Sequence, residues 1–259
     1  QAYRIFLPPQ YYTDYLGGSN LGARLLMDAG AYLYPALSPE NPFLILSGPI
    51  TGMNFPGTGR LHLMARSPQT GLIGEASIGG WAGLALRAAG FSGVKITGKA
   101  SSTGYLLITD DLKECQFIPT PELAGLDTYQ TEDQIKEAFT GEKIEVLSIG
   151  PAGENLIPIS SVVHRRHNVA ARTGLGAVMG SKNLKAIVIR SRGKQQPFFP
   201  EEFKELQREC LAELADHYWS QRRKEYGTVG SLEWALETGR APTKNWKDVD
   251  WLDEIKEIT

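Results

Sequence analysis

The sequence is poor in cysteine and lacks a secretory signal. Its 259 residues include only 2 cysteines, Cys115 and Cys210, which are too far apart for a C-x-x-C motif. We therefore expect no zinc or iron–sulfur ligand set within this chain and no disulfide scaffold. Because the N-terminus lacks a basic and then apolar segment, the composition favours a location in the reducing cytoplasm.

Neither sign of charge dominates, and there is no long apolar run. The 27 basic and 29 acidic side chains give a formal net charge of −2, so no strong positive field attracts the chain to nucleic acid. A membrane span would need about 18 consecutive apolar residues, which the sequence does not contain. We therefore expect neither nucleic acid nor a membrane as a partner. The shares of 42% hydrophobic and 22% charged residues are typical of a folded protein.

Glycine is the residue present in excess. The chain contains 28 glycines, above the average share of about 7%, and they concentrate in residues 48–104 and 150–180. Glycine permits positive φ and close approach of the backbone, so dense glycine in a folded region indicates irregular backbone held against a ligand or another surface. A strand-rich domain with many tight turns would give the same composition.

Apolar patterning predicts an α+β fold. Alternating or continuous apolar runs predict strands at residues 3–7, 43–47, 60–65, 94–96, 105–109, 114–118, 144–149, 156–163 and 184–190. Helical spacing and end signals predict helices at residues 20–29, 81–89, 131–139, 201–224 and 231–237. We predict a strand-rich domain at residues 1–195 and the beginning of a helical domain at residues 199–259. Trp251 and Ile255 have no obvious local core, which indicates a larger structure.

Two glycine patterns resemble nucleotide-binding motifs without meeting their requirements. Residues 174–180 read GLGAVMG, but a Rossmann site needs a strand before the glycines, a helix after them and an acidic residue about 20 positions on. The sequence offers only Gln195, Gln196 and Pro197 at that distance. The GSK at residues 180–182 does not begin a strand–loop–helix unit, so it does not meet the P-loop pattern.

Two glycine-flanked segments could bind an anion. Arg60 begins a predicted strand after Gly57-Thr-Gly, and its planar guanidinium suits a phosphate or carboxylate; a solvated arginine at a strand end is the simpler alternative. Gly79 and Gly80 precede the helix predicted at Trp81, where free N–H groups could hold an anion. An ordinary turn is the alternative there.

The densest polar cluster is residues 164–176, HRRHNVAARTGLG. His164 and His167 are three residues apart and could share a metal ion on a helix, but no third ligand is near. The three arginines beside glycines suit a small anion better, and a basic surface turn is the alternative. His62 and His217 are isolated and are predicted to be structural.

Together these segments resemble the N-terminal region of the tungsten-containing aldehyde ferredoxin oxidoreductase family, over about residues 15–240. The two long and specific matches are residues 149–155 (IGPAGEN) and 172–187 (RTGLGAVMGSKNLKAI). Shorter matches follow the same order, at residues 15–18, 22–26, 38–41, 48–52, 59–60, 67–71, 79–80, 86–90 and 98–100.

The resemblance implies a tungsten ion, or less often molybdenum, held by the dithiolenes of two pterins. It further implies a magnesium ion that bridges the pterin phosphates, and a 4Fe–4S cluster whose ligands lie outside this chain. The implied reaction is oxidation of an aldehyde to a carboxylic acid, with electrons passed to ferredoxin. The implied fold has two β-sheets that form a saddle for the cofactor, completed by helical domains.

The same resemblance assigns cofactor binding to Arg60, Ser77, Gly79, Gly80, Asn168, Val169, Ala171 and Arg172. This chain departs from the family where Ser77 replaces asparagine, Asn168 replaces arginine and Val169 replaces alanine. A backbone contact survives at Ser77, whereas one phosphate contact is weakened at Asn168 unless Arg165 or Arg166 substitutes. The residue pattern assigns no protein ligand to the metal.

The family's cluster cysteines and catalytic residues lie downstream of the matched region. We therefore expect no catalytic residue in this chain, and no activity without further domains or a split partner subunit. Two alternatives remain open: a non-catalytic binding or assembly module that kept the fold, and a related reductase of thioesters or acids. A homo-oligomer is compatible with the sequence.

Overall fold

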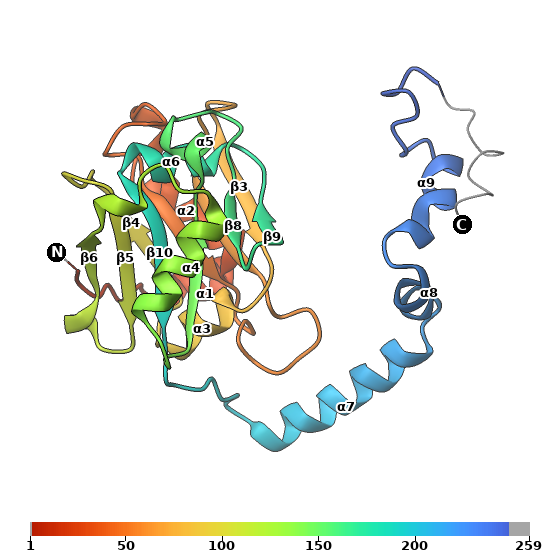
Figure 1. Ribbon diagram of the computed structural model, residues 1–259. Coiled ribbons are helices and arrows are strands. Elements are labelled where there is room, and N and C mark those ends of the chain that lie inside the picture. Colours follow the sequence, from red (N-terminus) through yellow and green to blue (C-terminus); the bar gives the residue numbers. More distant parts are fainter. Residues whose placement is uncertain (1, 249–259) are drawn as a thin grey trace. The chain divides into compact units, whose positions relative to one another are not determined.

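The computed structural model describes residues 2–248, and the chain divides into two compact units. The first unit is Gln1–Gln196 and the second is Pro197–Thr259. Figure 1 shows helices together with two separate sheets, so the α+β class predicted from the sequence is confirmed. Trp251 and Ile255 lie outside the described residues.

Both sheets belong to the first unit. The four-stranded sheet has the order β3-β2-β1-β4 and is antiparallel throughout. The six-stranded sheet has the order β6-β5-β10-β7-β8-β9, and β10 pairs in parallel with β5 and antiparallel with β7. The strands are β1 (Phe43–Ser47), β2 (Leu61–Arg66), β3 (Ile73–Ile78), β4 (Gly93–Ile96), β5 (Gly104–Thr109), β6 (Gln116–Pro119), β7 (Ile144–Ser148), β8 (Val162–His164), β9 (Asn168–Ala170) and β10 (Leu184–Arg190).

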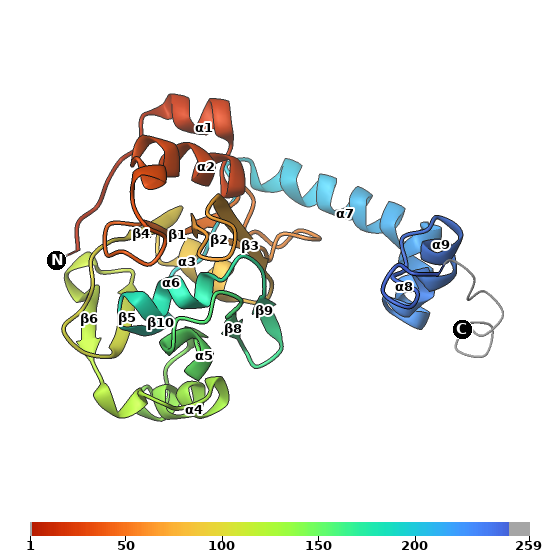
Figure 2. The same ribbon diagram turned by 90° about the horizontal axis from the view of Figure 1, so that it is seen from above.

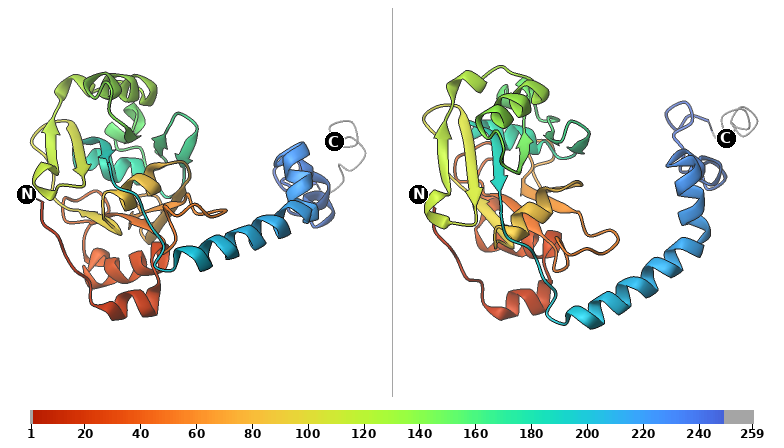
Figure 3. Two further views of the ribbon diagram at one scale, coloured as in Figure 1. Left: turned by 90° about the horizontal axis from the view of Figure 1, so that it is seen from below. Right: turned by 60° about the horizontal axis from the view of Figure 1, so that its bottom comes forward.

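Helices cover the outer faces of both sheets and fill the space between them. Figure 2 and the left view of Figure 3 show α1 and α2 on one side of the first unit and α4 on the other. Leu86 of α3 and Val178 of α6 are part of the core between the sheets. The helices are α1 (Pro9–Tyr15), α2 (Gly18–Asp28), α3 (Ala82–Ala88), α4 (Thr128–Ala138), α5 (Pro151–Glu154) and α6 (Leu175–Ser181), with α7 (Pro200–Asp216), α8 (Tyr218–Tyr226) and α9 (Leu232–Glu237) in the second unit.

This layering explains the continuous apolar runs of the central strands. In β1, Phe43 and Ile45 face the core between the sheets, while Leu44 and Leu46 pack with α2. Strand β10 alternates in the same way between that central core and a second core beneath α4. A strand buried on both faces favours apolar side chains along nearly its whole length, and the strands predicted at residues 43–47 and 184–190 are confirmed.

Two predicted strands are wrong. Residues 3–7 form no strand, because Tyr3, Ile5 and Phe6 are exposed and no neighbouring strand pairs with them. Of residues 156–163, only the end belongs to β8. Leu156 has a φ of +59° and Pro158 lacks the N–H that a strand ladder needs, so the segment before β8 is irregular.

Other element boundaries differ for local reasons. Strand β6 begins at Gln116 because the Asp111 side chain accepts from the N–H of Lys113 and caps a short 3₁₀ turn. The single helix predicted at residues 201–224 is broken at His217, whose backbone is extended with φ −73° and ψ 128°. Strands β3 and β9 and helices α1 and α5 were not predicted.

Lys182 follows α6 and is buried, with Nζ donating to the carbonyl of Pro39 at 2.9 Å. Burial lowers the pKa of its ammonium from 10.5 to about 8. Between these two pH values the unfolded chain binds the proton and the folded protein does not, so this residue makes the free energy of unfolding rise with pH. We expect the wild type to gain stability relative to Lys182→Met between pH 8 and 10.5.

Urea unfolding of both proteins at several pH values checks this expectation, because other titrations cancel in the difference between them. A difference that stays constant across this range would contradict it.

Candidate functional site

The residues implicated by the sequence gather where the two sheets meet at their edges. Strand β3 is an edge of the four-stranded sheet and β9 is an edge of the six-stranded sheet. Figures 1 and 2 show these strands beside one another, yet they do not pair into one sheet. An edge strand carries unpaired N–H and C=O groups along its free side, so two facing edges offer donors and acceptors to a ligand.

Glycines at one end of this seam are pressed against the opposite sheet. Gly80 has a φ of +93°, and a Cβ added to it would lie 2.6 Å from His164 Cδ2. A Cβ on Gly79 would lie 3.1 Å from Asn168 Oδ1, and one on Gly59 would lie 3.2 Å from the Gly80 carbonyl oxygen. The segments that contain Arg60, the two glycines and Asn168 therefore converge at this end.

The other end of the seam is held by Thr173. Its carbonyl accepts from the hydroxyl of Ser67 at 2.8 Å, and its own hydroxyl lies 3.4 Å from the carbonyl oxygen of Glu75 in β3, with the Arg172 carbonyl nearer at 2.7 Å. A Cβ on Gly74 would lie 2.9 Å from Thr173 Oγ1. Arg172 directly precedes this anchor, so its backbone lies alongside β3. The structure thus brings both arginines singled out by the sequence to the β3–β9 seam.

Among the arginines of residues 2–196, the guanidinium groups of Arg60 and Arg172 are the two without a protein partner. Both residues are exposed, and neither guanidinium has a hydrogen bond, ion pair or ring contact with another residue in the range 2–248. Every other arginine in residues 2–196 has a partner: Arg4, Arg24, Arg66, Arg87, Arg165, Arg166, Arg190 and Arg192. A guanidinium without a protein partner can give its planar array of donors to a phosphate.

Two neighbouring arginines are already neutralised by carboxylates. Arg165 donates to both oxygens of buried Glu145, at 2.8 and 2.6 Å, and this pairing raises the pKa of the guanidinium. Arg166 forms an ion pair with Asp133. Neither side chain therefore replaces the arginine that Asn168 lacks relative to the family. Asn168 contributes its amide against Gly79 and Gly80 instead.

Ser77 lies on β3 opposite His62 of β2. The ring of His62 packs against Gly18, and its Nδ1 is 2.8 Å from Glu75 Oε1. Ser77 is half-buried, and Val169 and Ala171 are exposed on and just after β9. Sequence reasoning missed the pair of His62 with Glu75, because their cross-strand contact depends on β3, which was not predicted.

The donor set indicates which ligands fit. No three His, Cys, Asp or Glu side chains within residues 2–248 come together as a metal site. Guanidinium and N–H groups suit phosphates, and backbone carbonyls suit a hard cation such as Mg²⁺. The donors of the seam therefore suit a phosphorylated ligand, while the described residues offer no ligand set of their own for a transition metal. Within residues 2–248, the structure contains no helix whose length and apolar content would allow it to span a membrane.

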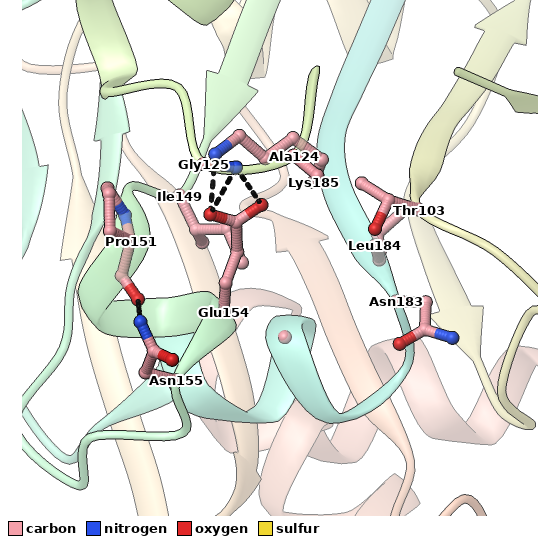
Figure 4. Close-up of a pocket in the computed structure, with 11 residues that line it drawn as sticks. Thr103, Ala124, Gly125, Ile149, Pro151, Glu154, Asn155, Asn183, Leu184 and Lys185 are labelled. Atoms are coloured by element: carbon pink, nitrogen blue, oxygen red, sulfur yellow. Dashed lines mark hydrogen bonds and ion pairs between the residues drawn. The ribbon is translucent and has the colours of Figure 1, made fainter. Parts of the chain in front are cut away.

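A cavity of about 290 Å³ lies elsewhere in the first unit, between the two long family motifs (Figure 4). Lys185 is fully buried there, and its Nζ lies 3.1 Å from Glu154 Oε2 and donates to the Leu126 carbonyl at 2.6 Å. Glu154 also accepts from the N–H of Gly125. Burial lowers the pKa of the Lys185 ammonium. These charged groups satisfy one another, so we interpret the two motifs as structural at this point.

Comparisons with known proteins show what this chain is similar to. The family model described as "Aldehyde ferredoxin oxidoreductase, N-terminal domain" matches residues 3–191. The tungsten-containing aldehyde ferredoxin oxidoreductase of Pyrococcus furiosus is 35% identical over 234 residues, which cover 90% of this chain and 38% of that protein. The protein of the same name from Thermococcus kodakarensis is 34% identical over 234 residues, with the same coverage.

Two further similarities concern proteins with other names. An aliphatic sulfonate oxidoreductase, WOR-like subunit, of Pyrococcus furiosus is 31% identical over 90% of this chain and 39% of its own length. A solved chain of the active site complex BamBC of benzoyl coenzyme A reductase, in complex with 1,5 dienoyl-CoA, superposes with a TM-score of 0.78 and 30% identity. That match covers 86% of this chain and 33% of the other. The chain spans less than two fifths of the P. furiosus aldehyde enzyme.

Proposed function

Because this chain belongs to the aldehyde ferredoxin oxidoreductase family, we propose that it is the cofactor-binding part of a tungsten or molybdenum bis-pterin oxidoreductase. The observation that carries the proposal is the β3–β9 seam, where two facing edge strands meet beside the unpartnered guanidinium groups of Arg60 and Arg172. Pterin phosphates are anions, and such anions are held by guanidinium groups and glycine-framed N–H donors.

Each proposed binding residue has a distinct task. Arg60 and Arg172 donate to cofactor phosphates or pterin rings, while Gly79 and Gly80 let the cofactor approach the backbone. The backbone carbonyl of Ser77 would help to hold a Mg²⁺ ion, whose preferred ligands are oxygens, and the backbone of Val169 would contact the second pterin. The Asn168 amide and the backbone of Ala171 complete the set: Arg60, Ser77, Gly79, Gly80, Asn168, Val169, Ala171 and Arg172.

When bound, the metal–pterin group supplies two-electron redox and Lewis-acid chemistry. The residues of this chain bind and orient the group and balance its negative charge. We propose that the complete enzyme oxidises an aldehyde to a carboxylic acid and passes the electrons through a 4Fe–4S cluster to ferredoxin. The cluster ligands and the groups that touch the substrate belong to the remaining domains or to a partner subunit, so this chain alone does not turn over.

Replacing either free arginine tests the cofactor assignment. Arg60→Ala or Arg172→Ala removes charge-assisted hydrogen bonds worth about 1.5–3 kcal/mol, so we expect affinity for the cofactor to fall about 10- to 100-fold. The measurement is tungsten and pterin content of the protein purified together with its remaining domains. Arg192→Ala is the matched control, because Arg192 is exposed and its guanidinium lies 4.0 Å from Glu142, which is not one of the proposed binding residues. Unchanged content in both site variants would contradict the assignment.

The structural similarity to the benzoyl coenzyme A reductase complex supports a second candidate substrate. The same cofactor site would then serve a reductase that acts on an aromatic thioester. Assays of the complete enzyme with an aldehyde and an electron acceptor, and with benzoyl-CoA and a strong reductant, separate the two. A complete assembly that contains neither tungsten nor pterin would instead identify a non-catalytic binding or assembly module.

A further inference from the structure

The ring of His164 connects elements of both sheets. His164 ends β8 and is fully buried. Its Nδ1 lies 2.9 Å from the carbonyl oxygen of Val146 in β7, within the six-stranded sheet. Its Nε2 lies 3.2 Å from the backbone nitrogen of Trp81, which caps α3 just after the glycines that follow β3. One side chain thus contacts both sides of the β3–β9 seam.

These two contacts require a neutral ring. The carbonyl of Val146 can only accept, so Nδ1 carries the hydrogen, and the N–H of Trp81 can only donate, so Nε2 does not. Burial lowers the pKa of His164, which favours this neutral form. Glu145 Oε2 lies 3.4 Å from Nε2 and would favour a charged ring, but Arg165 pairs with both oxygens of that carboxylate.

The ring also shapes the glycine turn. A Cβ on Gly80 would lie 2.6 Å from His164 Cδ2 and 2.8 Å from Nε2, so the turn packs directly on the ring. Asn168, which begins β9, is the cross-strand partner of His164 in the β8–β9 hairpin. The guanidinium of Arg165 lies 5.7 Å from the centre of the Trp81 ring and supports the same turn from outside. Displacement of the His164 ring would therefore move both sides of the seam.

We propose that His164 is a positioning residue, whose neutral ring holds the Gly79–Gly80 turn against the six-stranded sheet and so fixes the two edge strands that receive the cofactor. The proposal rests on the proposed function for the identity of the ligand, while the bridge itself is a property of the protein. From their spacing in the sequence, His164 and His167 were weighed as a metal pair, but a small anion was favoured. Both ring nitrogens of His164 are instead engaged by the backbone, and His167 is exposed.

Two substitutions separate this role from simple packing. His164→Leu keeps an apolar side chain but makes neither hydrogen bond, whereas His164→Gln retains one donor and one acceptor. His167→Leu is the matched control in the same hairpin. We expect His164→Leu to raise amide hydrogen exchange at Trp81 about tenfold or more relative to the β10 amides of Ile187 and Ile189. His164→Gln should restore most of the protection, and His167→Leu should leave it unchanged.

The second measurement is tungsten and pterin content of the complete protein, where we expect a loss of about tenfold for His164→Leu and recovery for His164→Gln. The proposal is overturned if Trp81 exchange in His164→Leu stays at the wild-type level or rises only in parallel with β10. It is also overturned if that exchange rises while cofactor content does not change. A wild-type protein without tungsten or pterin would refute the proposed function, and Trp81 exchange would still decide whether His164 forms the bridge.

Discussion

Replacing Lys185 by alanine is expected to lower the free energy of unfolding by about 3–5 kcal/mol. The Lys185 side chain belongs to β10 and is fully buried. Its ammonium contacts Glu154 of α5 and the carbonyl of Leu126, so it connects three segments of the chain. Its removal leaves the Glu154 carboxylate with the N–H of Gly125 as its remaining donor. It also leaves a cavity where the lysine stem packed. Urea unfolding monitored by circular dichroism measures the loss.

Further variants test whether the loss of stability in Lys185→Ala comes from the buried ion pair. Lys194→Ala is the control, because Lys194 is exposed and surface substitutions usually stay within about 0.5 kcal/mol. The double variant Lys185→Met with Glu154→Gln should recover part of the loss, since it removes both charges and keeps the volume. Equal stability of Lys185→Ala and Lys194→Ala would show that the buried ion pair contributes nothing.

Gly180→Ala is expected to destabilise the protein by about 3 kcal/mol. Helices α5 and α6 touch through their backbones, and a Cβ on Gly180 would lie 2.0 Å from the carbonyl oxygen of Gly153. A backbone carbonyl cannot move aside by changing a rotamer, as a side chain can, so α5 and α6 would have to separate. Alanine favours a helix over glycine by about 1 kcal/mol, and the expected value is the net effect after that gain. Thermal or urea unfolding checks the prediction.

Gly22→Ala is the matched control for this change. Gly22 is also within a helix, and its added Cβ would approach two side chains, Met64 Sδ at 2.2 Å and Leu46 Cδ1 at 2.7 Å. Side chains can shift more easily than backbone, so we expect a smaller loss of stability than for Gly180→Ala. If the two variants were equally destabilised, backbone contact between α5 and α6 would not be the reason.

The central strands could be predicted because a strand buried on both faces has a nearly continuous run of apolar residues in the sequence. Strands β1 and β10 are mostly apolar, with Ser47 and Lys185 as their buried polar exceptions, since each lies in a sheet covered on both faces. Strand β3 was missed because Gly74, Glu75 and Ser77 interrupt its apolar pattern. As an edge strand it has a neighbouring strand on one side only, so fewer of its side chains need to be apolar. The wrong strand at residues 156–163 has apolar side chains that the structure exposes, including Ile157 and Ile159.

The sequence predicted only part of the candidate site. Glycine density and the resemblance pointed to Arg60, Gly79 and Arg172 as binding residues, but arginine-rich composition could not distinguish ligand-binding groups from ion pairs. Arg165 and Arg166 belong to the same basic cluster, yet their carboxylate partners are distant in sequence. Partner choice depends on distances in space, which residue spacing does not specify.

By itself, the sequence determined the fold class, because apolar runs are local chemical properties, and its ordered motifs carried the resemblance to the family and to residue types that suit a phosphorylated cofactor. Only the tertiary structure decided that β3 and β9 meet as unpaired edges, that two guanidinium groups there have no partner within residues 2–248, and that His164 contacts both Val146 and Trp81. His164 and Trp81 are separated by 83 residues, and such a contact exists only once long-range strand order has placed both segments side by side.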